Sequence, residues 1–207
     1  FRRVLFRSRN PLIYDKKSQR WVEFPSKYWF SLAYLYRLRI LDIEICWSNN
    51  DVILSFDGLY IETSAHDQSI EVTIREAFFD DEYRVKNRDL SGKIVLDIGA
   101  NIGDSSINFA RKGARVISFE PLKILHEYLK KNVTNNNLGS NIDIHYVGLS
   151  NKNEKVNVWI KKDGTACASP IFHEKNMKDA KLGRELSTME LVAATDYITK
   201  QIGRAHV

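Results

Sequence analysis

The segment from Ile94 to Asp104 constrains the fold more than any other part of the chain. An apolar run, residues 94–98, is interrupted only by Asp97 and leads into Gly99-Ala100-Asn101-Ile102-Gly103-Asp104. This order predicts a β-strand, a glycine turn and the start of a helix. A second apolar run, residues 115–119, ends at Glu120, so an acid lies near the end of each strand. The pattern is typical of α/β sheets that bind an adenosine-bearing cofactor at the carboxyl ends of their strands.

Strand-like and helix-like segments alternate from Lys93 onward. Right-handed crossovers are expected to place the first three strands side by side, and the apolar run 94–98 predicts a strand covered on both faces. The sequence therefore predicts an α/β fold with a Rossmann-like sheet. The expected helices are 103–112 and 122–132, the further strands are 142–147 and 156–160, and the polar segment 161–190 is expected to be a loop with a short helix.

A β-hairpin is expected ahead of this sheet. Two β-rich runs, 52–56 and 59–63, are joined by Asp57-Gly58, a pair that accepts the positive φ angles of a type I′ turn. Asp67 is expected to cap a following helix, and Ser26 an earlier one. We expect residues 9–90 to form this helix, hairpin and helix, a polar connector to occupy 87–92, and residues 91–201 to form an incomplete cofactor-binding domain.

The spacing of the glycine turn favours S-adenosylmethionine over a dinucleotide. The Gly-x-Gly-x-x-Gly fingerprint of NAD-binding proteins is absent, because Asn101 stands where the second glycine would be. Asp104 falls in the first turn of the helix, where its charge would repel a diphosphate. A nucleoside that carries a positive sulfonium tolerates both Asp97 and Asp104.

Each residue of the turn has an expected role. Gly99 allows a sharp turn and a close approach of the backbone to the ligand, and Gly103 allows tight packing at the helix start. Asp97 is expected to accept a hydrogen bond from the methionine ammonium, and Glu120 from both ribose hydroxyls. Backbone N–H groups of Ala100 to Gly103 are expected to bind the methionine carboxylate. A purely structural turn would explain both glycines, but not Asp97, an acid inside an apolar strand.

The two ends of the chain match the translation of a common short-read sequencing adapter. The last six residues, 202–207, correspond to the DNA ATCGGAAGAGCACACGTC, and its opposite strand, read further, gives residues 1–8. We expect both segments to be non-native, which leaves a fragment; the alternative, a basic targeting arm, would make the match a coincidence. The formal net charge of +5 becomes +1 without the arginines of these segments, Arg2, Arg3, Arg7 and Arg204.

Composition narrows the possible partners. A nearly neutral core without a basic run gives little support to nucleic-acid binding, and charges interrupt the apolar stretch of 28–46, so a membrane span is not expected. Cys46 and Cys167 lack metal-ligand or disulfide spacing, so we expect reduced thiols, no metal site and a cytoplasmic protein. The sequon that begins at Asn132 falls in an expected helix and is interpreted as chance.

Four segments of the chain resemble the FkbM-type S-adenosylmethionine-dependent methyltransferases. The resemblance covers about residues 52–200 and implies a class I methyltransferase sheet that transfers a methyl group, mostly to hydroxyl oxygens of sugars or secondary metabolites. It implies that Asp97, Gly99, Asn101, Gly103 and Glu120 line the cofactor and that Val147-Gly148 lies near adenine. The four segments are 94–104, 119–121, 73–83 and 147–151.

The resemblance also has a gap. The family continues after a segment like 193–198 with a strand that carries a Lys-Ile-Asp-x-Glu-Gly-like run, which is absent here. The chain is therefore expected to hold only the N-terminal half of the sheet, to lack part of the active site and to be inactive by itself. No catalytic base is assigned. Acids and a tyrosine at 76–83 are more typical of a solvated helix end, and His126 and His145 of surface or packing positions.

Two functions of other classes stay open. One is an NAD-type dinucleotide-binding oxidoreductase, and the other is a non-catalytic module that binds S-adenosylmethionine. The expected partner of a methyltransferase is a small-molecule or glycan acceptor.

Overall fold

The structure is a computed structural model that describes residues 4–5, 12–15, 20–23, 41–48, 50–65, 67, 69–161 and 184–205. The helix expected after Ser26 and the thiol of Cys167 lie outside the described residues. Within the described part of the chain, none of the helices combines the length and the apolar character that a bilayer crossing requires.

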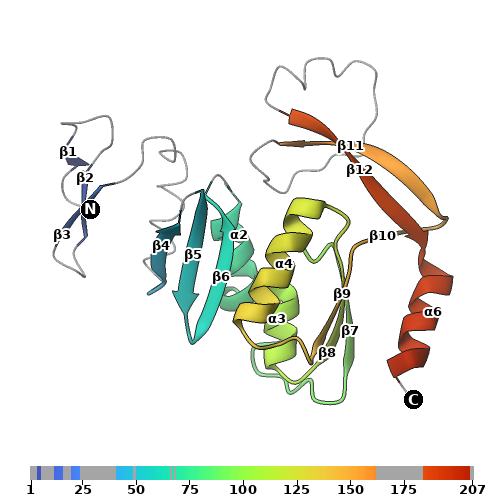
Figure 1. Cartoon of the computed structure of the whole chain (residues 1–207). Helices are drawn as coiled ribbons and strands as arrows, with labels where there is room; N and C mark the ends of the chain where they lie inside the picture. The colour runs from blue at the N-terminus through green and yellow to red at the C-terminus, as the bar shows by residue number, and fades with distance from the viewer. Residues whose placement is uncertain are drawn as a thin grey trace.

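A parallel sheet of three strands forms the centre of the fold (Figure 1). Strands β7 (Ile94–Ile98), β8 (Arg115–Phe119) and β9 (Ile142–His145) pair in the order β7-β8-β9. Helices α3 (Asp104–Arg111) and α4 (Lys123–Asn135) connect them. The strand–helix alternation, the parallel order and the Rossmann-like α/β class that the sequence predicts are confirmed.

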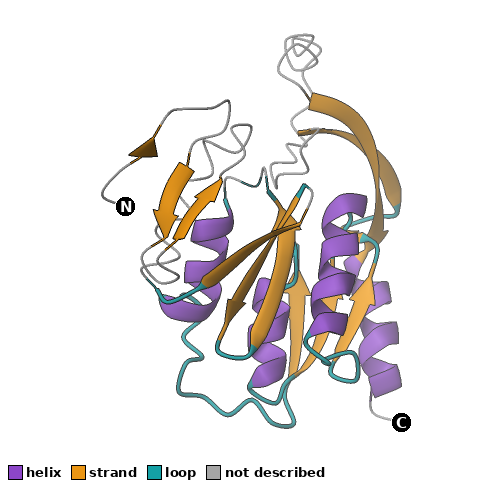
Figure 2. Cartoon of the chain, turned by 60° about the vertical axis from the view of Figure 1, so that its left-hand side comes forward, coloured by secondary structure: helices purple, strands orange, loops and turns teal. Residues whose placement is uncertain are grey.

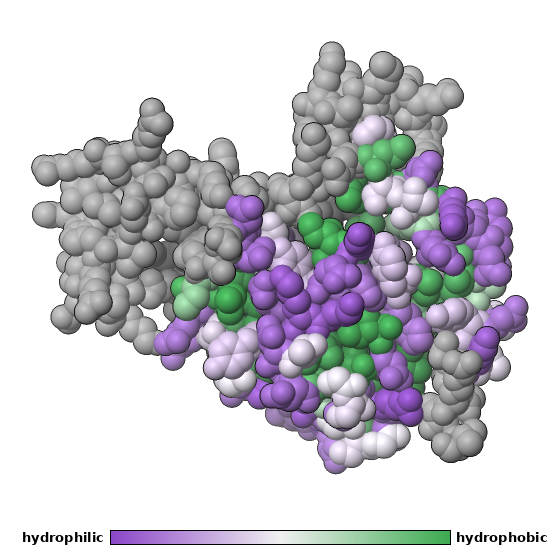
Figure 3. All heavy atoms as spheres, in the orientation of Figure 1, coloured by the Kyte–Doolittle hydropathy of each residue, from purple (hydrophilic) through white to green (hydrophobic). Residues whose placement is uncertain are grey.

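The two connecting helices bury the residues that the periodicity predicts. Ile107 and Ala110 of α3 are buried, and the helix ends before Gly113, whose φ of +92° suits a C-terminal glycine. The apolar stripe of α4 faces the core, while its outer face carries the hydrophilic side chains that gather in the middle of Figure 3. The buried residues of that stripe are Leu122, Leu125, Leu129 and Val133.

Strand β7 is less buried than its apolar run predicts, which corrects one expectation. An apolar run predicts burial on both faces, but the side chains of residues 94–97 are only half-buried, and Ile98 is 61% exposed. Strand β8 covers one side of β7, and no other strand among the described residues pairs with it. An edge position leaves its backbone groups and apolar side chains open on one side.

The expected hairpin is confirmed ahead of the sheet. Strands β4 (Glu44–Ser48), β5 (Asp51–Phe56) and β6 (Leu59–Ser64) are antiparallel, and Asp57 and Gly58 take φ angles of 47° and 72°. Both values are positive, as a type I′ turn requires.

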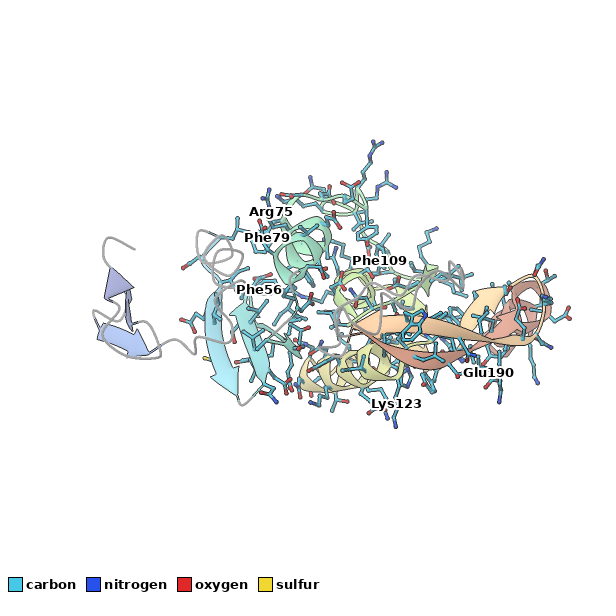
Figure 4. The ribbon with its side chains drawn as sticks, turned by 90° about the horizontal axis from the view of Figure 1, so that it is seen from above. Phe56, Arg75, Phe79, Phe109, Lys123 and Glu190 are labelled. Carbon is cyan, nitrogen blue, oxygen red and sulfur yellow. The ribbon has the colours of Figure 1, made fainter. Side chains whose placement is uncertain are left out.

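The helix after the hairpin differs from the expectation in its cap and in its form. Ser69 is the N-cap of α2 (Ile70–Ile74), and Asp67 instead accepts hydrogen bonds from the backbone N and the Oγ of Ser69. The helix continues as the π-helix η2 (Arg75–Phe79), and Phe79 packs against Phe56 of the hairpin (Figure 4). Its predicted inner face is confirmed by the burial of Ile70, Ile74 and Ala77.

The C-terminal part forms a second sheet, which corrects the expected loop at residues 184–190. Strand β12 (Arg184–Ala193) is antiparallel to β11 (Glu154–Lys161) and parallel to the short β10 (Gly148–Ser150). The β11–β12 ribbon rises away from the central sheet (Figures 1 and 2). Polar and apolar residues mix along β12, so periodicity alone does not reveal it, whereas pairing with β11 stabilises it. Residues 162–183 lie outside the described residues.

Two further groups of elements complete the described chain. Helix α6 (Ala194–Ala205) follows β12 directly. Strands β1 (Val4–Leu5), β2 (Leu12–Asp15) and β3 (Arg20–Glu23) form an antiparallel sheet in that order.

Two asparagines of α4 hold the edge of the hairpin. Asn132 accepts a hydrogen bond from the backbone N of Glu62 (2.7 Å) and donates to its carbonyl oxygen (3.0 Å). Asn136 does the same with the N (3.0 Å) and O (2.7 Å) of Tyr60. Asn132 also donates to the carbonyl oxygen of Ile102 in the glycine turn (2.8 Å). Residues 60 and 62 are alternate positions of β6, so their backbone groups face the same edge of the strand. Each asparagine amide therefore makes the pair of hydrogen bonds that a residue of a neighbouring strand would otherwise make.

Asn132→Ala is expected to reduce the free energy of unfolding by about 2 kcal/mol, because it leaves part-buried backbone groups of Glu62 and Ile102 without partners. Urea denaturation of the folded chain measures the change. Asn135→Ala, an exposed position of the same helix, is the control and is expected to stay within about 0.5 kcal/mol of the parent. Equal losses in both variants would contradict a specific role for Asn132.

Candidate functional site

Asp97 is fixed by hydroxyl groups at the carboxyl end of β7. Its Oδ2 accepts hydrogen bonds from Ser105 Oγ (2.6 Å) and Ser106 Oγ (2.5 Å) in the first turn of α3. Ser106 Oγ also lies 2.7 Å from the hydroxyl of Ser118, the residue that pairs with Asp97 on β8. The acid that the sequence singles out is therefore half-buried and held in one orientation by neighbouring serines.

Glu120 follows β8 and ties two loops together. One carboxylate oxygen, Oε2, accepts a hydrogen bond from the backbone N of Asn101 (2.9 Å), and Oε1 accepts one from the backbone N of Leu122 (2.8 Å). The side chain is only 4% exposed. Because each carboxylate oxygen has two lone pairs, both oxygens can still accept a further hydrogen bond.

Burial raises the pKa of two acids here. The pKa of Glu120 is raised to about 7, mainly because burial removes water from the carboxylate, and the charge of Asp97 adds to this; the N–H groups of Leu122 and Asn101 oppose it. The pKa of Asp104 is raised to about 8 by burial first and by Asp97 second. The charge of Asp97 therefore acts on both acids, as expected if all three carboxyl groups lie near the carboxyl ends of β7 and β8.

The two glycines of the turn have different physical roles. Gly99 has a φ of +80°, and an added Cβ would meet no atom within 4 Å, so it is required for its backbone conformation beside open space. Gly103 has a φ of +93°, and an added Cβ would lie 2.6 Å from Cδ1 of Leu129. The expectation that Gly103 allows close packing at the start of α3 is confirmed.

Three of the four backbone N–H groups between Ala100 and Gly103 have hydrogen-bond partners within the protein. The N–H groups of Ala100 and Asn101 donate to the Phe119 carbonyl oxygen and to Glu120, and that of Gly103 donates to the Ala100 carbonyl oxygen. These three groups serve the turn itself, so they are not available to a carboxylate in this conformation. A turn this tight uses its own N–H donors internally, which the spacing of residues alone does not reveal.

Two buried acceptors of the turn have no hydrogen-bond partner. They are Oδ1 of Asn101, whose φ is 52°, and Oδ1 of Asp104, the first residue of α3. Buried polar atoms are nearly always paired in folded proteins. Both oxygens can therefore accept hydrogen bonds from donors outside the chain.

The segment after β9 lies beside Glu120. The backbone N of Glu120 donates to the carbonyl oxygen of His145, and an added Cβ at Gly148 would lie 3.3 Å from Cγ of Pro121. Val147 and Gly148, which the resemblance places near adenine, thus adjoin the residues that follow β8. Tyr146 lies between them and β9, is 46% exposed and packs against His126 with ring centroids 4.8 Å apart.

The candidate bases occupy different environments. Tyr83 is 45% exposed and packs edge-on against Phe109; burial and the charges of Asp104 and Asp97 raise the pKa of its hydroxyl, so it lies near the strand end. Asp81 is a turn residue whose Oδ1 accepts hydrogen bonds from the backbone N of Val85 and Lys86. Glu76 lies in η2, and Glu82 follows it at an exposed position.

Both histidines have packing contacts. His145 stacks on Phe119 with ring centroids 5.2 Å apart, and its Nδ1 lies 3.2 Å from the hydroxyl of Tyr197. Burial lowers the pKa of His145 and of His126. These contacts agree with the packing roles that the sequence favours.

Several site residues are not among those that the sequence predicts. Ser118 is the only polar side chain between Arg115 and Glu120, and its place beside Asp97 in the register is a signal that could have identified it. Ser105 and Ser106 have a weaker signal, a serine pair in the first turn of a helix. Among the described residues, no group of three or more His, Cys, Asp or Glu side chains is placed to hold a metal ion.

Comparison with known proteins gives one family. A family model described as "Methyltransferase FkbM domain" matches residues 97–200, just over half of the chain and the whole segment from Asp97 to α6. No curated protein matches the chain at the significance required.

Three solved structures are similar to parts of the chain. A transferase of Pyrococcus horikoshii is 18% identical with a TM-score of 0.39, over 59% of this chain and 48% of that chain. TYW2 of M. jannaschii in complex with AdoMet is 22% identical with a TM-score of 0.35, over 49% and 45%. A SAM-dependent methyltransferase from Agrobacterium tumefaciens is 18% identical with a TM-score of 0.36, over 50% and 34%. This chain spans half or less of the length of each.

Proposed function

The chain belongs to the FkbM methyltransferase family, and from this premise we propose that it binds S-adenosylmethionine at the carboxyl ends of β7 and β8. The reaction is transfer of the methyl group to a hydroxyl oxygen of a small-molecule or glycan acceptor. The observation that carries the proposal is the pair Asp97 and Glu120, two acids at adjoining strand ends that share one electrostatic environment.

The residues present fit this cofactor. The unpartnered oxygens of Asn101 and Asp104 can accept hydrogen bonds from its ammonium and hydroxyl groups. Glu120 can accept from both ribose hydroxyls while it keeps its two backbone bonds. The open space in front of Gly99 allows a ligand to approach the backbone. Val147 and Gly148 would lie near the adenine.

The cofactor supplies a methyl group bonded to a positive sulfur. The chain would contribute binding and alignment: Glu120 would hold the ribose and the acids near β7 would hold the methionine end, so that the acceptor oxygen is aligned with the methyl group. The acceptor would lose its hydroxyl proton to a base of the protein. Tyr83, whose hydroxyl shares the electrostatic environment of Asp97 and Asp104, is one candidate for that role.

The active site is completed by a further strand in this proposal. No strand among the described residues pairs with the outer edge of β7, and Ile98 is exposed there; both observations support a parallel strand that pairs at this edge and carries acceptor-side groups. The 207-residue chain is therefore expected to bind S-adenosylmethionine, whereas its methyl-transfer activity is expected to be low. The proposal also places the protein in the cytoplasm, which the free thiol of Cys46 supports.

S-adenosylmethionine is expected to stabilise the chain, whereas NAD⁺ is not. A ligand at 100 times its dissociation constant adds about 2.7 kcal/mol to the free energy of unfolding, which raises the Tm by several degrees. Differential scanning fluorimetry with each ligand measures the shift. A shift with NAD⁺ and none with S-adenosylmethionine would establish the dinucleotide alternative.

Transfer itself needs a separate measurement on a protein that includes the further strand. Radioactive methyl incorporation into sugar and secondary-metabolite hydroxyl acceptors is expected. Tight binding of S-adenosylmethionine without transfer to any acceptor would instead indicate a non-catalytic binding module.

A further inference from the structure

Asp104 is a buried acid for which the described chain offers no counter-ion. It is the first residue of α3, keeps 6% of its surface exposed, and has an Oδ1 atom without a hydrogen-bond partner. The charged groups that act on its carboxyl are themselves acids, Asp97 and Asp67. Among the described residues, no lysine or arginine forms an ion pair with any of these three acids.

The carboxyl of Asp104 accepts hydrogen bonds from the backbone N–H groups of Asp104 and Ser105, but its Oδ1 atom has no partner. Asp67 accepts hydrogen bonds from Ser69 and from Thr63 Oγ1. Asp97 accepts two hydroxyl hydrogen bonds through one oxygen, and Glu120 accepts one backbone hydrogen bond at each oxygen. Of the four acids, Asp104 is the one with a buried oxygen that lacks a partner. Burial without a counter-ion disfavours the ionised form of Asp104, so a positively charged donor at its Oδ1 would stabilise the carboxylate.

The position of Asp104 connects it with the open end of β7. Asp97, which acts on its carboxyl, is followed by the exposed residues Ile98 and Gly99. The hydroxyl of Tyr83 shares the electrostatic environment of Asp97 and Asp104 and interacts with Ser105. A ligand that enters beside Gly99 therefore meets Asp97 and Asp104 together.

We propose that Asp104 is the counter-ion of the α-ammonium group of the methionine moiety, and that Asp97, oriented by Ser105 and Ser106, accepts a second hydrogen bond from the same group. This rests on the proposed function and names a contact that the sequence assigns to Asp97 alone. An ammonium has three N–H donors and satisfies an unpartnered acceptor, whereas a sulfonium has no donor to offer. Hydrogen bonds to charged groups are the stronger ones, and two acids around one ammonium share its charge.

The test compares ligands with and without the ammonium in Asp104→Asn. The probes are S-adenosylmethionine, S-adenosylhomocysteine, and the deaminated analogue of S-adenosylhomocysteine, which keeps the carboxylate. Isothermal titration calorimetry is expected to show a loss of about 10- to 100-fold for the first two and none for the third. Asp89→Asn removes an equal charge from an exposed turn and is expected to change none of the three affinities.

Each other outcome has a definite meaning. If the parent chain binds no S-adenosylmethionine, the proposed function fails. If the parent binds it and Asp104→Asn loses affinity for all three ligands, for S-adenosylmethionine alone, or for none, this inference is overturned while the proposed function stands. Asp104→Ser, which retains a short polar residue at the helix start, is measured in place of Asp104→Asn if that variant fails to fold.

Discussion

Glu120→Gln is expected to weaken S-adenosylmethionine binding by about 100-fold, or roughly 2.7 kcal/mol. Both carboxylate oxygens accept a backbone N–H, from Asn101 and Leu122, in addition to the ribose hydroxyls proposed for them. The amide nitrogen of glutamine would face one of these N–H donors, so the glycine turn would shift and one ribose contact would be lost. Calorimetric titration measures the affinity. Glu127→Gln, an exposed position on α4, is the control and is expected to bind normally.

The same substitution has a consequence for stability without ligand. The pKa of Glu120 is raised by burial to about 7 in the folded chain, from an ordinary value of 4.5, so the folded state holds this proton more tightly. The free energy of unfolding is therefore expected to fall as pH rises from about 4.5 to about 7, because the folded carboxyl must ionise without water. Glu120→Gln cannot ionise and is expected to show a smaller decrease. An identical pH profile in both proteins would contradict the burial argument.

Gly103→Ala is expected to lower the free energy of unfolding by about 2–5 kcal/mol. A positive φ costs a residue with a Cβ about 1–2 kcal/mol, and overfilling a packed core costs about 1–3 kcal/mol more. The added Cβ would lie 2.6 Å from Cδ1 of Leu129, which is itself fully buried and has little room to move. Chemical denaturation measures the loss.

Gly92→Ala separates the two costs. Gly92 has a φ of +72°, and an added Cβ there would meet no atom within 4 Å, so only the backbone strain applies. We expect a loss of about 1–2 kcal/mol in this control. Equal losses at both positions would show that Leu129 yields to the new methyl group and that close packing is not the reason for Gly103.

Local sequence patterns are sufficient to predict the main elements of the central sheet and of the hairpin. The apolar stripe of α4, the glycine after α3 and the Asp57-Gly58 turn each specify backbone conformation within a few residues, so sequence alone predicts them. Strand β12 is different, because its stability comes from pairing of residues 184–191 with β11, a partner that precedes it by a long segment. The burial of β7 is a related case, since an apolar run shows that a strand can be covered but not which neighbours cover it.

The candidate site also contains residues that the sequence identifies and residues that only the folded structure identifies. Asp97 and Glu120 stand out because an acid at the end of an apolar strand has few structural explanations. Asp104 is harder to interpret, because an acid in the first turn of a helix is common and favourable for the helix dipole. Only its burial and its unpartnered oxygen distinguish it, and both depend on how α3 packs. The N–H groups of Ala100 and Asn101 likewise require the folded turn to show that they are occupied.

The hydrogen bonds from the side chains of Asn132 and Asn136 to β6 have a further consequence for how the molecule unfolds. The hairpin strand they hold is remote in sequence from α4, yet Asn132 also binds Ile102 inside the glycine turn. Melting of the hairpin therefore cannot proceed far without loosening the turn. Amide hydrogen exchange of β6 and of the glycine turn should then follow a single opening event, and a ligand bound at the turn should slow exchange in a strand that it never touches.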